Sequence, residues 1–598
     1  MASRAIKTDP EVVAEAEAIF VRWLDGFGVS LDAGQGEAIA AHFLADGYWK
    51  DFLALTWDFR TFAGQGEIAG ELAPMIARSG IRSLHIAEGR PAPRLCKRSG
   101  RLVVEAFFNY ETCIGNGTGV VRLAQDEAGE WKAWLLLTTL QELRGFEERI
   151  GAHRPTGEEF SKYLVKENWL DRRNAEQERA GDQPPVLIVG AGHAGLILAA
   201  RLKSMGLDPL IIEKDARIGD VWRKRYHSLT LHNQVFANHM PYLPFPVTWP
   251  VWLPKDKLAN WLETYADALE LNVWTSTELT AAEYDEASKS WRAQVKRADG
   301  SVQRIVCRNL VISTGVSGSI PKKPRLPGLE NFAGEVLHSS EYTRGESYAG
   351  KSVLVVGTGN SGHDIAQDLH VNGAAKVHLL QRSPTCVVSL EPTAIRTYSV
   401  YSEDTPVEDV DLLTSVIPYP ILEETYKWIT SKSKVVDEEL IEALQSVGFR
   451  TFNGDDDTGF HMMYLRGEGG YYINVGCSDL IIEKAIDVVD YSNMNGFSAQ
   501  AIELADGTSL PCDAVILATG FENMQENVRK LLGDDIADAV GPIWGLDQHC
   551  HMRNMWKPTV QPGLWIMGGA LIDARLFSRF LAIQIVADVH GITPSAGN

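Results

Sequence analysis

Hydrophobic and polar positions change their spacing along the chain, and they predict helices first, then strands, then repeated strand–helix–strand units. Apolar residues recur with helical spacing near residues 11–26 and 35–46. Apolar runs then predict strands at 82–89, 101–112 and 117–143. Helices followed by an antiparallel sheet predict an α+β domain over residues 1–175.

A polar, charged segment, residues 167–185, follows and ends in two prolines. This composition favours a linker or an exposed helix that leads into a new domain. Beyond it, short buried runs alternate with helical runs, which predicts parallel sheets flanked by helices. A chain of 598 residues is too long for one hydrophobic core, so we expect several domains.

The first strand–helix unit contains a glycine-rich turn. The stretch VLIVGAGHAGLILAARL places Gly190, Gly192 and Gly195 in the pattern G-x-G-x-x-G. These glycines permit a tight turn, close approach of the backbone to a pyrophosphate, and close packing of helix on strand. The next strand ends at Glu213, whose carboxylate can accept hydrogen bonds from ribose hydroxyls and repels a 2′-phosphate. The unit therefore predicts a site for FAD or NAD rather than NADP.

A second copy of this pattern, KSVLVVGTGNSGHDIAQDL, begins at Lys351. Its second strand ends in Arg382 and Ser383, where the first copy has an acid. Arginine and a hydroxyl suit a 2′-phosphate, so this site should prefer NADPH. The cofactor-binding residues predicted here are Gly357, Gly359, Asn360, Ser361, Gly362, Arg382 and Ser383.

Two nucleotide sites of opposite 2′ preference in one chain imply that electrons pass from NADPH to a bound flavin. The predicted fold is α/β, with two dinucleotide-binding, Rossmann-like domains after the N-terminal α+β domain, and with the NADPH domain inserted in the FAD domain. We expect the N-terminal domain at 1–175 and the NADPH domain, with an insertion, at 346–510. The FAD domain is expected in two segments, 176–345 before the NADPH domain and 511–598 after it.

A linker motif suggests a family. FAGEVLHSSEY, residues 332–342, matches F-x-G-x-x-x-H-x-x-x-[YF] and resembles the flavin-containing monooxygenases with two dinucleotide motifs, a group that includes YUCCA-like enzymes and Baeyer–Villiger monooxygenases. Trp222 matches the tryptophan of the family's GG-x-W segment, and Thr519 and Gly520 match an A-T-G-type strand end. The resemblance covers about residues 185–585. The element order before it resembles the cone-shaped NTF2-like (SnoaL-like) domain.

The resemblance implies an oxygenation reaction. In this family NADPH would reduce FAD, and O2 would add to the reduced flavin to give a C4a-(hydro)peroxyflavin. One oxygen atom would then pass to a small organic substrate. The linker motif ends in Tyr342-Thr343. The typical Baeyer–Villiger form has Trp-Pro or Trp-Asp there, so we expect oxygenation at a soft nitrogen or sulfur or at an indole-like centre. A Baeyer–Villiger enzyme that converts ketones to esters or lactones on the same scaffold remains the alternative.

Two neighbouring residues are the catalytic candidates. In many family members an asparagine after Y-x-S-L lies beside the flavin. Counted from Tyr226, that position is His232, and Asn233 follows it. Either a one-residue shift lets Asn233 serve, or His232 has replaced the asparagine, or both are packing or capping residues. We interpret His338 as a structural or nicotinamide-adjacent linker residue and Asp364 as a helix-start acid.

Composition narrows the partners. The net charge of −21 disfavours binding to nucleic acid or to anionic membranes. The seven cysteines are scattered, and neither they nor the histidines have metal-ligand spacing, so we expect no disulfide framework and no metal. No apolar run is long enough to span a membrane and no secretory signal opens the chain, which predicts a cytoplasmic protein. The expected partners are a small-molecule substrate and O2, with a homodimer left open.

Other hypotheses concern the type of reaction, the role of the N-terminal domain and the role of residues 454–476. A disulfide or dye reductase would also pair FAD with NADPH, but it needs a redox-active cysteine pair that this sequence lacks. The N-terminal domain could be a binding or assembly module, or a catalytic one, in which case Asp51 and Asp58 are the acids to test. Residues 454–476, rich in glycine and aromatic residues, either cover a substrate pocket or pack as a surface excursion.

Overall fold

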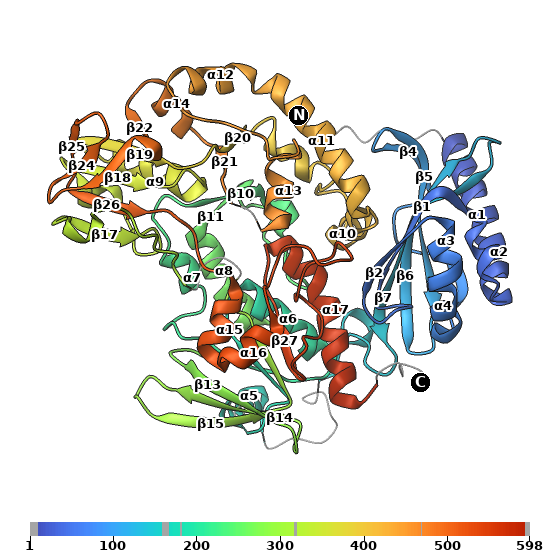
Figure 1. Ribbon diagram of the computed structural model, residues 1–598. Helices are drawn as coiled ribbons and strands as arrows, with labels where there is room; N and C mark the ends of the chain where they lie inside the picture. The colour runs from blue at the N-terminus through green and yellow to red at the C-terminus, as the bar shows by residue number, and fades with distance from the viewer. Residues whose placement is uncertain (1–9, 158–166, 180–181, 316–319, 468, 593–598) are drawn as a thin grey trace.

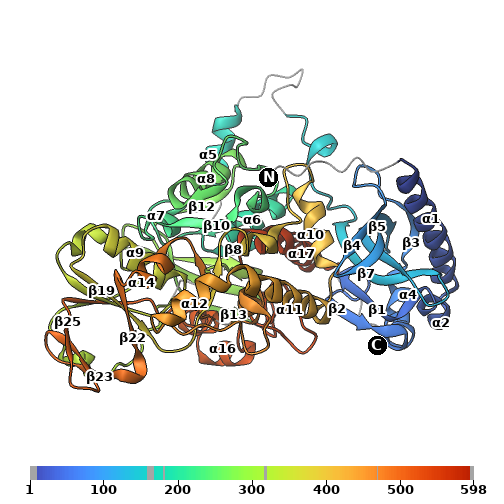
Figure 2. The same cartoon turned by 90° about the horizontal axis from the view of Figure 1, so that it is seen from above.

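The computed structural model describes residues 10–157, 167–179, 182–315, 320–467 and 469–592. The N-terminal domain forms one side of the molecule, and the rest comprises two sheet-centred domains and a mainly helical insertion (Figure 1). Seen from above, the N-terminal sheet lies beside helices α10 (Val407–Ser415) and α17 (Leu571–His590) (Figure 2). The N-terminal domain therefore borders the other domains directly.

The N-terminal domain packs helices on a seven-stranded sheet of order β2-β1-β7-β6-β5-β3, with β4 on β5. The β1–β7 pair is parallel and the other pairs are antiparallel. Its helices are α1 (Pro10–Ala33), α2 (Gly36–Ala40), α3 (Gly64–Glu67), a π-helical turn (Ile68–Leu72) and α4 (Ala73–Ser79). Its strands are β1 (Phe43–Phe52), β2 (Phe59–Ala63), β3 (Arg82–Ile86), β4 (Arg94–Arg98), β5 (Arg101–Glu111), β6 (Gly115–Gln125) and β7 (Trp131–Leu143).

This order agrees with the prediction of helices before a sheet, with one correction. The helix expected at 35–46 ends at Ala40, because Phe43 pairs with Ala133 and begins β1. Trp49 on the same strand is fully buried, and its ring lies 5.4 Å from that of Phe43. The apolar residues near position 43 therefore serve the sheet rather than a helix face.

Asp51 and Asp58 have structural partners. Asp51 accepts hydrogen bonds from the backbone N–H groups of Leu55 and Thr56, both through Oδ2, and from the Thr138 hydroxyl through Oδ1. Burial raises the pKa of Asp51 to about 6. Asp58 accepts from the backbone N–H of the residue after it at 2.8 Å. Both acids therefore close the turn between β1 and β2.

A first parallel sheet of five strands, ordered β12-β9-β8-β16-β27, carries the first glycine motif. Helix α17 buries most of its length, from Phe580 to Ala587 without a break, and it packs against α6. The strands are β8 (Val186–Val189), β9 (Leu210–Ile212), β12 (Asn272–Trp274), β16 (Asn309–Ile312) and β27 (Leu564–Ile566). Helices α5 (Trp169–Arg179), α6 (His193–Ser204), α7 (Asp220–Arg223), α8 (Lys255–Ala268), α15 (Met524–Leu532) and α16 (Asp534–Val540), and strands β10 (Thr230–Gln234), β11 (Trp252–Pro254), β13 (Glu278–Asp285), β14 (Ser290–Lys296) and β15 (Val302–Cys307), complete this domain.

A second parallel sheet, ordered β17-β26-β18-β19-β22, carries the second glycine motif. Because β26 pairs with both β17 and β18, this sheet extends beyond the predicted range 346–510 at both ends. Its strands are β17 (Glu335–His338), β18 (Ser352–Val356), β19 (Lys376–Gln381), β22 (Ile486–Asp490) and β26 (Ala514–Leu517); α9 (Asn360–Val371) follows β18, and β23 (Met494–Phe497), β24 (Ala501–Leu504) and β25 (Ser509–Pro511) form a small antiparallel sheet. The predicted α/β fold with two parallel sheets is confirmed.

The insertion lies between β19 and β22. Its two strands pair in parallel, and its helix α10 packs against α17 (Figure 1). The elements are β20 (Cys386–Ser389), α10, α11 (Tyr419–Val436), α12 (Glu438–Ser446), α13 (Gly459–Arg466), β21 (Tyr471–Asn474) and α14 (Cys477–Ile482). Residues 454–476 thus supply α13 and β21 rather than an irregular loop.

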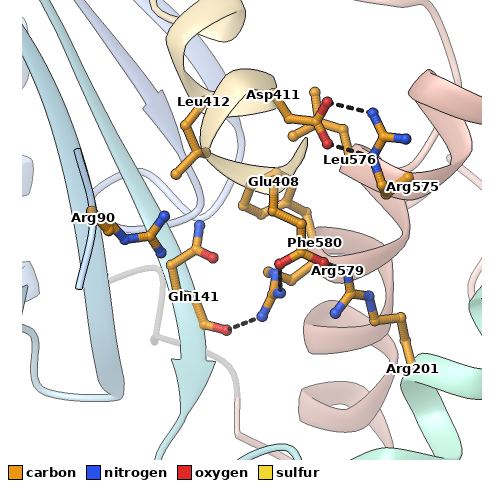
Figure 3. Close-up of a pocket in the computed structure, with 10 residues that line it drawn as sticks. All are labelled: Arg90, Gln141, Arg201, Glu408, Asp411, Leu412, Arg575, Leu576, Arg579 and Phe580. Carbon is orange, nitrogen blue, oxygen red and sulfur yellow. Dashed lines mark hydrogen bonds and ion pairs between the residues drawn. The ribbon is translucent and has the colours of Figure 1, made fainter. Parts of the chain in front are cut away.

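Charged side chains meet where the N-terminal domain, α6, α10 and α17 come together (Figure 3). Arg201 on α6 donates to Glu148 at 2.8 Å and to Glu408 on α10 at 2.6 Å. Arg579 on α17 also reaches Glu408, at 2.8 Å, and the main-chain oxygen of Gln141. The cavity left between them is about 20 Å³, room for one water molecule. The junction is therefore filled by an ion network that leaves little room for a ligand.

We predict that Arg201→Met destabilises the protein by about 3–5 kcal/mol, because it leaves the buried Glu148 carboxylate with the longer ion pair to Arg579, at 3.4 Å, in place of two cations. The Arg201 and Glu148 side chains are only 2% and 5% exposed, whereas 44% of the Glu408 side chain is exposed. Most of the lost stability therefore comes from the Arg201–Glu148 pair. Denaturant unfolding measures the loss. Arg82→Ala, which removes an exposed ion pair with Glu111, is the control and should cost about 0–1 kcal/mol. A similar small loss for both variants would contradict the buried network.

Acid should also destabilise the wild type through this network. Nearby arginines hold the pKa values of Glu148 and Glu408 below their usual range. A depressed folded-state pKa stabilises the protein above the unfolded-state value, about 4.3, and this stabilisation disappears as the pH falls through the folded-state pKa. Unfolding free energies measured from pH 7 down to pH 3 should therefore fall less steeply in Arg201→Met than in wild type. Parallel curves would contradict this.

Candidate functional site

The first glycine loop connects β8 to α6 and contains two positions where a Cβ does not fit. Gly190 has φ +111°, and a Cβ there would lie 2.5 Å from the carbonyl oxygen of Ser313. A Cβ on Gly195 would lie 2.1 Å from the carbonyl oxygen of Gly190. A Cβ on Gly192, the N-cap of α6, would meet no described atom within 4 Å. The first and third glycines are thus needed for packing, whereas the second leaves open space before a helix N-terminus, which attracts phosphate.

Glu213 faces this loop. It follows β9 and accepts hydrogen bonds from the backbone N–H groups of Ala191 at 2.8 Å and Asp215 at 2.9 Å. Burial raises the pKa of Glu213, and these two hydrogen bonds oppose that shift. The carboxylate is therefore fixed beside the first loop, at the edge where a ribose would lie.

Two buried polar groups near the loop lack partners among the described residues. The Trp222 indole N–H and the Ser313 hydroxyl have no hydrogen bond. The ring of Trp222 lies 6.4 Å from that of His193, the first residue of α6. Because buried polar groups are normally hydrogen-bonded, orphaned groups beside a glycine loop fit a site completed by a polar ligand. The residues present therefore fit a bound dinucleotide.

The second glycine loop repeats the geometry of the first. Gly357 also has φ +111°, and its Cβ would lie 2.5 Å from the carbonyl oxygen of Ala518. A Cβ on Gly362 would lie 2.0 Å from the carbonyl oxygen of Gly357. Gly359 is the N-cap of α9, and a Cβ there would make only ordinary contact, 3.7 Å from the Tyr471 carbonyl oxygen. Both loops therefore present the same free helix N-terminus.

The predicted residues between these glycines bind protein groups. The Asn360 side chain accepts a hydrogen bond from the backbone N–H of Ile473 on β21 at 2.9 Å. The Ser361 hydroxyl contacts the Tyr226 phenol and opposes the rise of the Tyr226 pKa, which burial raises well above its usual value. Both residues thus hold neighbouring segments against the loop.

Basic residues collect where β19 ends. Arg382 and Ser383 are exposed, and the Arg382 guanidinium forms no ion pair within the described chain. Arg450, from the insertion, donates through Nη2 to the Arg382 carbonyl at 2.9 Å and pairs with Asp490 at 3.1 Å. Two guanidinium groups therefore stand at the edge where the first site has Glu213. Sequence reasoning missed Arg450 because 68 residues separate it from Arg382 and no spacing rule links them.

The two catalytic candidates point in different directions. His232 and Asn233 are neighbours on β10, so their side chains leave opposite faces of the strand. Burial lowers the pKa of His232, and the Asp364 carboxylate opposes that shift. Asn233 hydrogen-bonds the Tyr398 phenol in the insertion. The structure therefore brings His232 toward the second nucleotide domain and Asn233 toward the insertion.

Asp364 is partly buried and hydrogen-bonded, so it is not a free helix-start acid. It lies one turn into α9 and accepts a hydrogen bond from the Tyr226 hydroxyl at 2.6 Å. Burial raises its pKa. Together with His232, these groups connect β10 to α9 across the two domains.

A second partly buried acid lies at the start of α17. Asp573 accepts hydrogen bonds from the Ala570 backbone N–H at 3.0 Å and from the Tyr464 hydroxyl at 2.8 Å. Burial raises the pKa of Asp573. Tyr464 belongs to α13, so some of the segment 454–476 packs against the first nucleotide domain. The pocket-cover hypothesis for that segment stays a prediction.

The linker residues are anchored to each other. His338 contacts the Gly520 carbonyl oxygen through Nε2 at 2.9 Å, and the Thr519 hydroxyl donates to the Lys322 carbonyl oxygen at 2.5 Å. Burial lowers the pKa of His338. His338 therefore fixes the strand end that follows β26, as a structural linker residue would.

Three further observations concern chemistry elsewhere in the chain. All seven cysteines are free thiols in the structure. Within the described ranges, no group of three or more histidine, cysteine, aspartate or glutamate side chains could hold a metal ion. None of the described helices is both long enough and apolar enough to cross a bilayer.

Comparisons with known proteins agree with this geometry. The family profile for flavin-binding monooxygenase-like proteins matches residues 184–400. The indole-3-pyruvate monooxygenase YUCCA1 of Oryza sativa subsp. japonica is 30% identical over 61% of this chain and 83% of its own length. The probable indole-3-pyruvate monooxygenase YUCCA9 of Arabidopsis thaliana is 30% identical over 69% of this chain and 88% of its own length.

Among solved structures, the oxidised steroid monooxygenase bound to NADP aligns with a TM-score of 0.50 at 18% identity, over 68% of this chain and 86% of that one. At this identity the likeness shows a shared fold alone.

We predict that Gly192→Ala abolishes flavin binding without unfolding the chain. A Cβ there meets no described protein atom within 4 Å, so only a ligand would clash with it. Flavin content per chain and apoprotein thermal unfolding measure the two effects. Gly66→Ala, at a helical glycine that also has open space, is the matched control. Full flavin occupancy in Gly192→Ala would show that no pyrophosphate lies against this loop.

Proposed function

This chain belongs to the flavin-binding monooxygenase-like family, and we propose that it uses NADPH and FAD to insert one atom of O2 into a small substrate at an indole-like, soft nitrogen or sulfur centre. The observation that carries the proposal is the pair of glycine loops with matching geometry and opposite chemistry at the ribose edge, Glu213 in one and Arg382 in the other. One loop suits FAD and the other suits NADPH.

The protein's own contribution is binding and orientation. Glu213 and the α6 N-terminus would hold the FAD ribose and pyrophosphate, whereas the α9 N-terminus and Arg382 would hold those of NADPH. When bound, the reduced flavin supplies the chemistry that activates O2. His232, kept neutral by its lowered pKa, and Asn233 would donate hydrogen bonds near the reacting atoms, and the buried surroundings exclude water.

Arg450 extends the 2′-phosphate site. Its Nη2 already contacts the Arg382 main chain, so a phosphate held by Arg382 would lie within reach of a second guanidinium. Two arginines bind phosphate more tightly than one, because each adds charge-assisted hydrogen bonds. We include Arg450 among the NADPH-binding residues.

The relatives suggest a first substrate. The two relatives described above are named for indole-3-pyruvate, so an indole-bearing 2-oxo acid is the first substrate to test.

For the N-terminal domain we propose an NTF2-like fold, supported by its helices before a sheet that ends in three long antiparallel strands. We further propose that the protein acts in the cytoplasm, where NADPH is available.

Oxygen labelling tests the proposed reaction. The flavin-loaded protein is given NADPH, ¹⁸O2 and, separately, indole-3-pyruvate, a thioether, a tertiary amine and a cyclic ketone. We expect one ¹⁸O atom per product molecule and one NADPH consumed for the first three classes. Conversion of the ketone to a labelled lactone would instead support the Baeyer–Villiger reaction. Hydrogen peroxide as the sole product with every class would contradict the proposal.

The cofactor selectivity gives a second test. Arg382→Ala and Arg450→Ala should each raise the KM for NADPH about 10- to 100-fold, which corresponds to losing about 1.5–3 kcal/mol of hydrogen bonding to a charged group. The KM for NADH should stay unchanged, because NADH lacks the 2′-phosphate. NADPH oxidation rates measure both constants, and Arg82→Ala is the remote control. Equal increases for NADPH and NADH would contradict the assignment.

A further inference from the structure

Helix α10 is held at both ends by the N-terminal domain. Arg90 forms an ion pair with Asp409 in the first turn of α10. At the other end, Arg122 donates to the Leu413 carbonyl oxygen at 2.8 Å, and Lys50 donates to the Ile417 carbonyl oxygen at 3.0 Å. A negative residue near the helix N-terminus and the Arg122 guanidinium at a C-terminal carbonyl are the favourable arrangement for the helix dipole. Burial lowers the pKa of Lys50 to about 7, so its contribution there is mainly the hydrogen bond.

One buried ion pair, Asp411–Arg575, joins α10 to α17. Arg575 donates to both carboxylate oxygens of Asp411 at 2.7 Å, and the two side chains are 0% and 2% exposed (Figure 3). The Tyr401 hydroxyl donates to the same carboxylate at 2.8 Å. Because the pair is bidentate and enclosed, it fixes the orientation of the guanidinium.

The same guanidinium reaches the backbone beside the catalytic candidates. Arg575 Nη1 donates to the carbonyl oxygens of Ala237 at 2.8 Å and His239 at 2.7 Å. Between them, the Asn238 side chain donates to the Asn233 carbonyl oxygen at 3.2 Å. Hydrogen bonds and ion pairs therefore connect the N-terminal domain, through α10 and Arg575, to the segment after β10 and, through Asn238, to Asn233 on β10.

We propose that the N-terminal domain is a positioning element for the oxygenation site. It holds α10, and α10 through Asp411 sets Arg575, which fixes the segment 230–239 that carries His232 and Asn233. Arg575 and Asp411 are positioning residues, since neither touches the proposed reacting atoms. The catalytic meaning of this segment rests on the proposed function, but the mechanical coupling does not.

Amide hydrogen exchange of the flavin-loaded full-length chain tests the coupling. The double variant Lys50→Met/Arg90→Gln loosens the hold on α10 from the N-terminal domain alone. We expect exchange in residues 230–239 to rise about tenfold, equivalent to about 1.4 kcal/mol of local opening, although both substitutions lie more than 100 residues away in sequence. Arg82→Ala in the same domain is the control and should change nothing. Faster exchange in α10 with wild-type exchange in 230–239 would overturn the proposal.

A second variant, Asp411→Asn, tests the coupling if the double variant speeds amide exchange throughout the N-terminal domain. This substitution keeps the side-chain shape but weakens the hold on Arg575, so exchange in 230–239 should rise while β5 and β6 stay protected. Unchanged exchange in 230–239 would overturn the proposal.

A catalytic readout separates positioning from plain stability. Without substrate, NADPH, O2 and a proton yield NADP⁺ and hydrogen peroxide, and a loosened site should release peroxide several-fold faster at an unchanged KM for NADPH. A raised KM at an unchanged rate would contradict a role in positioning. If the wild type oxygenates no substrate, the proposed function fails, but the exchange result still decides the coupling.

Discussion

The architecture depends on two places where a helix approaches a strand too closely for any side chain. At Gly195 and Gly362 a Cβ would lie 2.1 and 2.0 Å from the carbonyl oxygen of the motif's first glycine. This contact sets each helix N-terminus over the end of its sheet. At the middle glycine of each loop, a Cβ would meet either nothing within 4 Å, at Gly192, or only an ordinary contact, at Gly359. A phosphate-binding site is thus a consequence of packing, and having two of them lets a single chain bring an electron donor and a flavin together.

The rest of the chain orients these two sites relative to each other. His338 connects the linker to the strand end at Gly520, and the Tyr226–Asp364 hydrogen bond joins the segment just before β10 to α9. At the junction with the N-terminal domain, ion pairs among Glu148, α6, α10 and α17 connect that domain to the helices that pack on the first sheet. Buried ion pairs contribute little net stability, but breaking one is costly, which suits a junction that must adopt one arrangement.

Sequence patterns predicted the regions whose constraints are local. The glycine spacing, the acid at Glu213 and the basic residue at Arg382 follow from rules that span one strand–helix unit, and the structure places them in matching positions. The start of strand β1 was assigned to a helix, because Phe43 and its neighbours have helical spacing and only their pairing with β7 makes them a strand. The strands β2 and β4 were not predicted either, and they pair with β1 and β5. Arg450, Asp573 and the Asp411–Arg575 pair join segments from 68 to 164 residues apart, and no local pattern marks such contacts.

The most direct measurement is an experimental structure of the protein with FAD and NADP⁺ bound. We predict the FAD pyrophosphate over Gly192 with its ribose at Glu213, and the NADP⁺ 2′-phosphate between Arg382 and Arg450. We also predict that the flavin ring lies within hydrogen-bonding reach of His232 or Asn233. FAD in the second loop, or a 2′-phosphate away from both arginines, would contradict the assignment of the two sites.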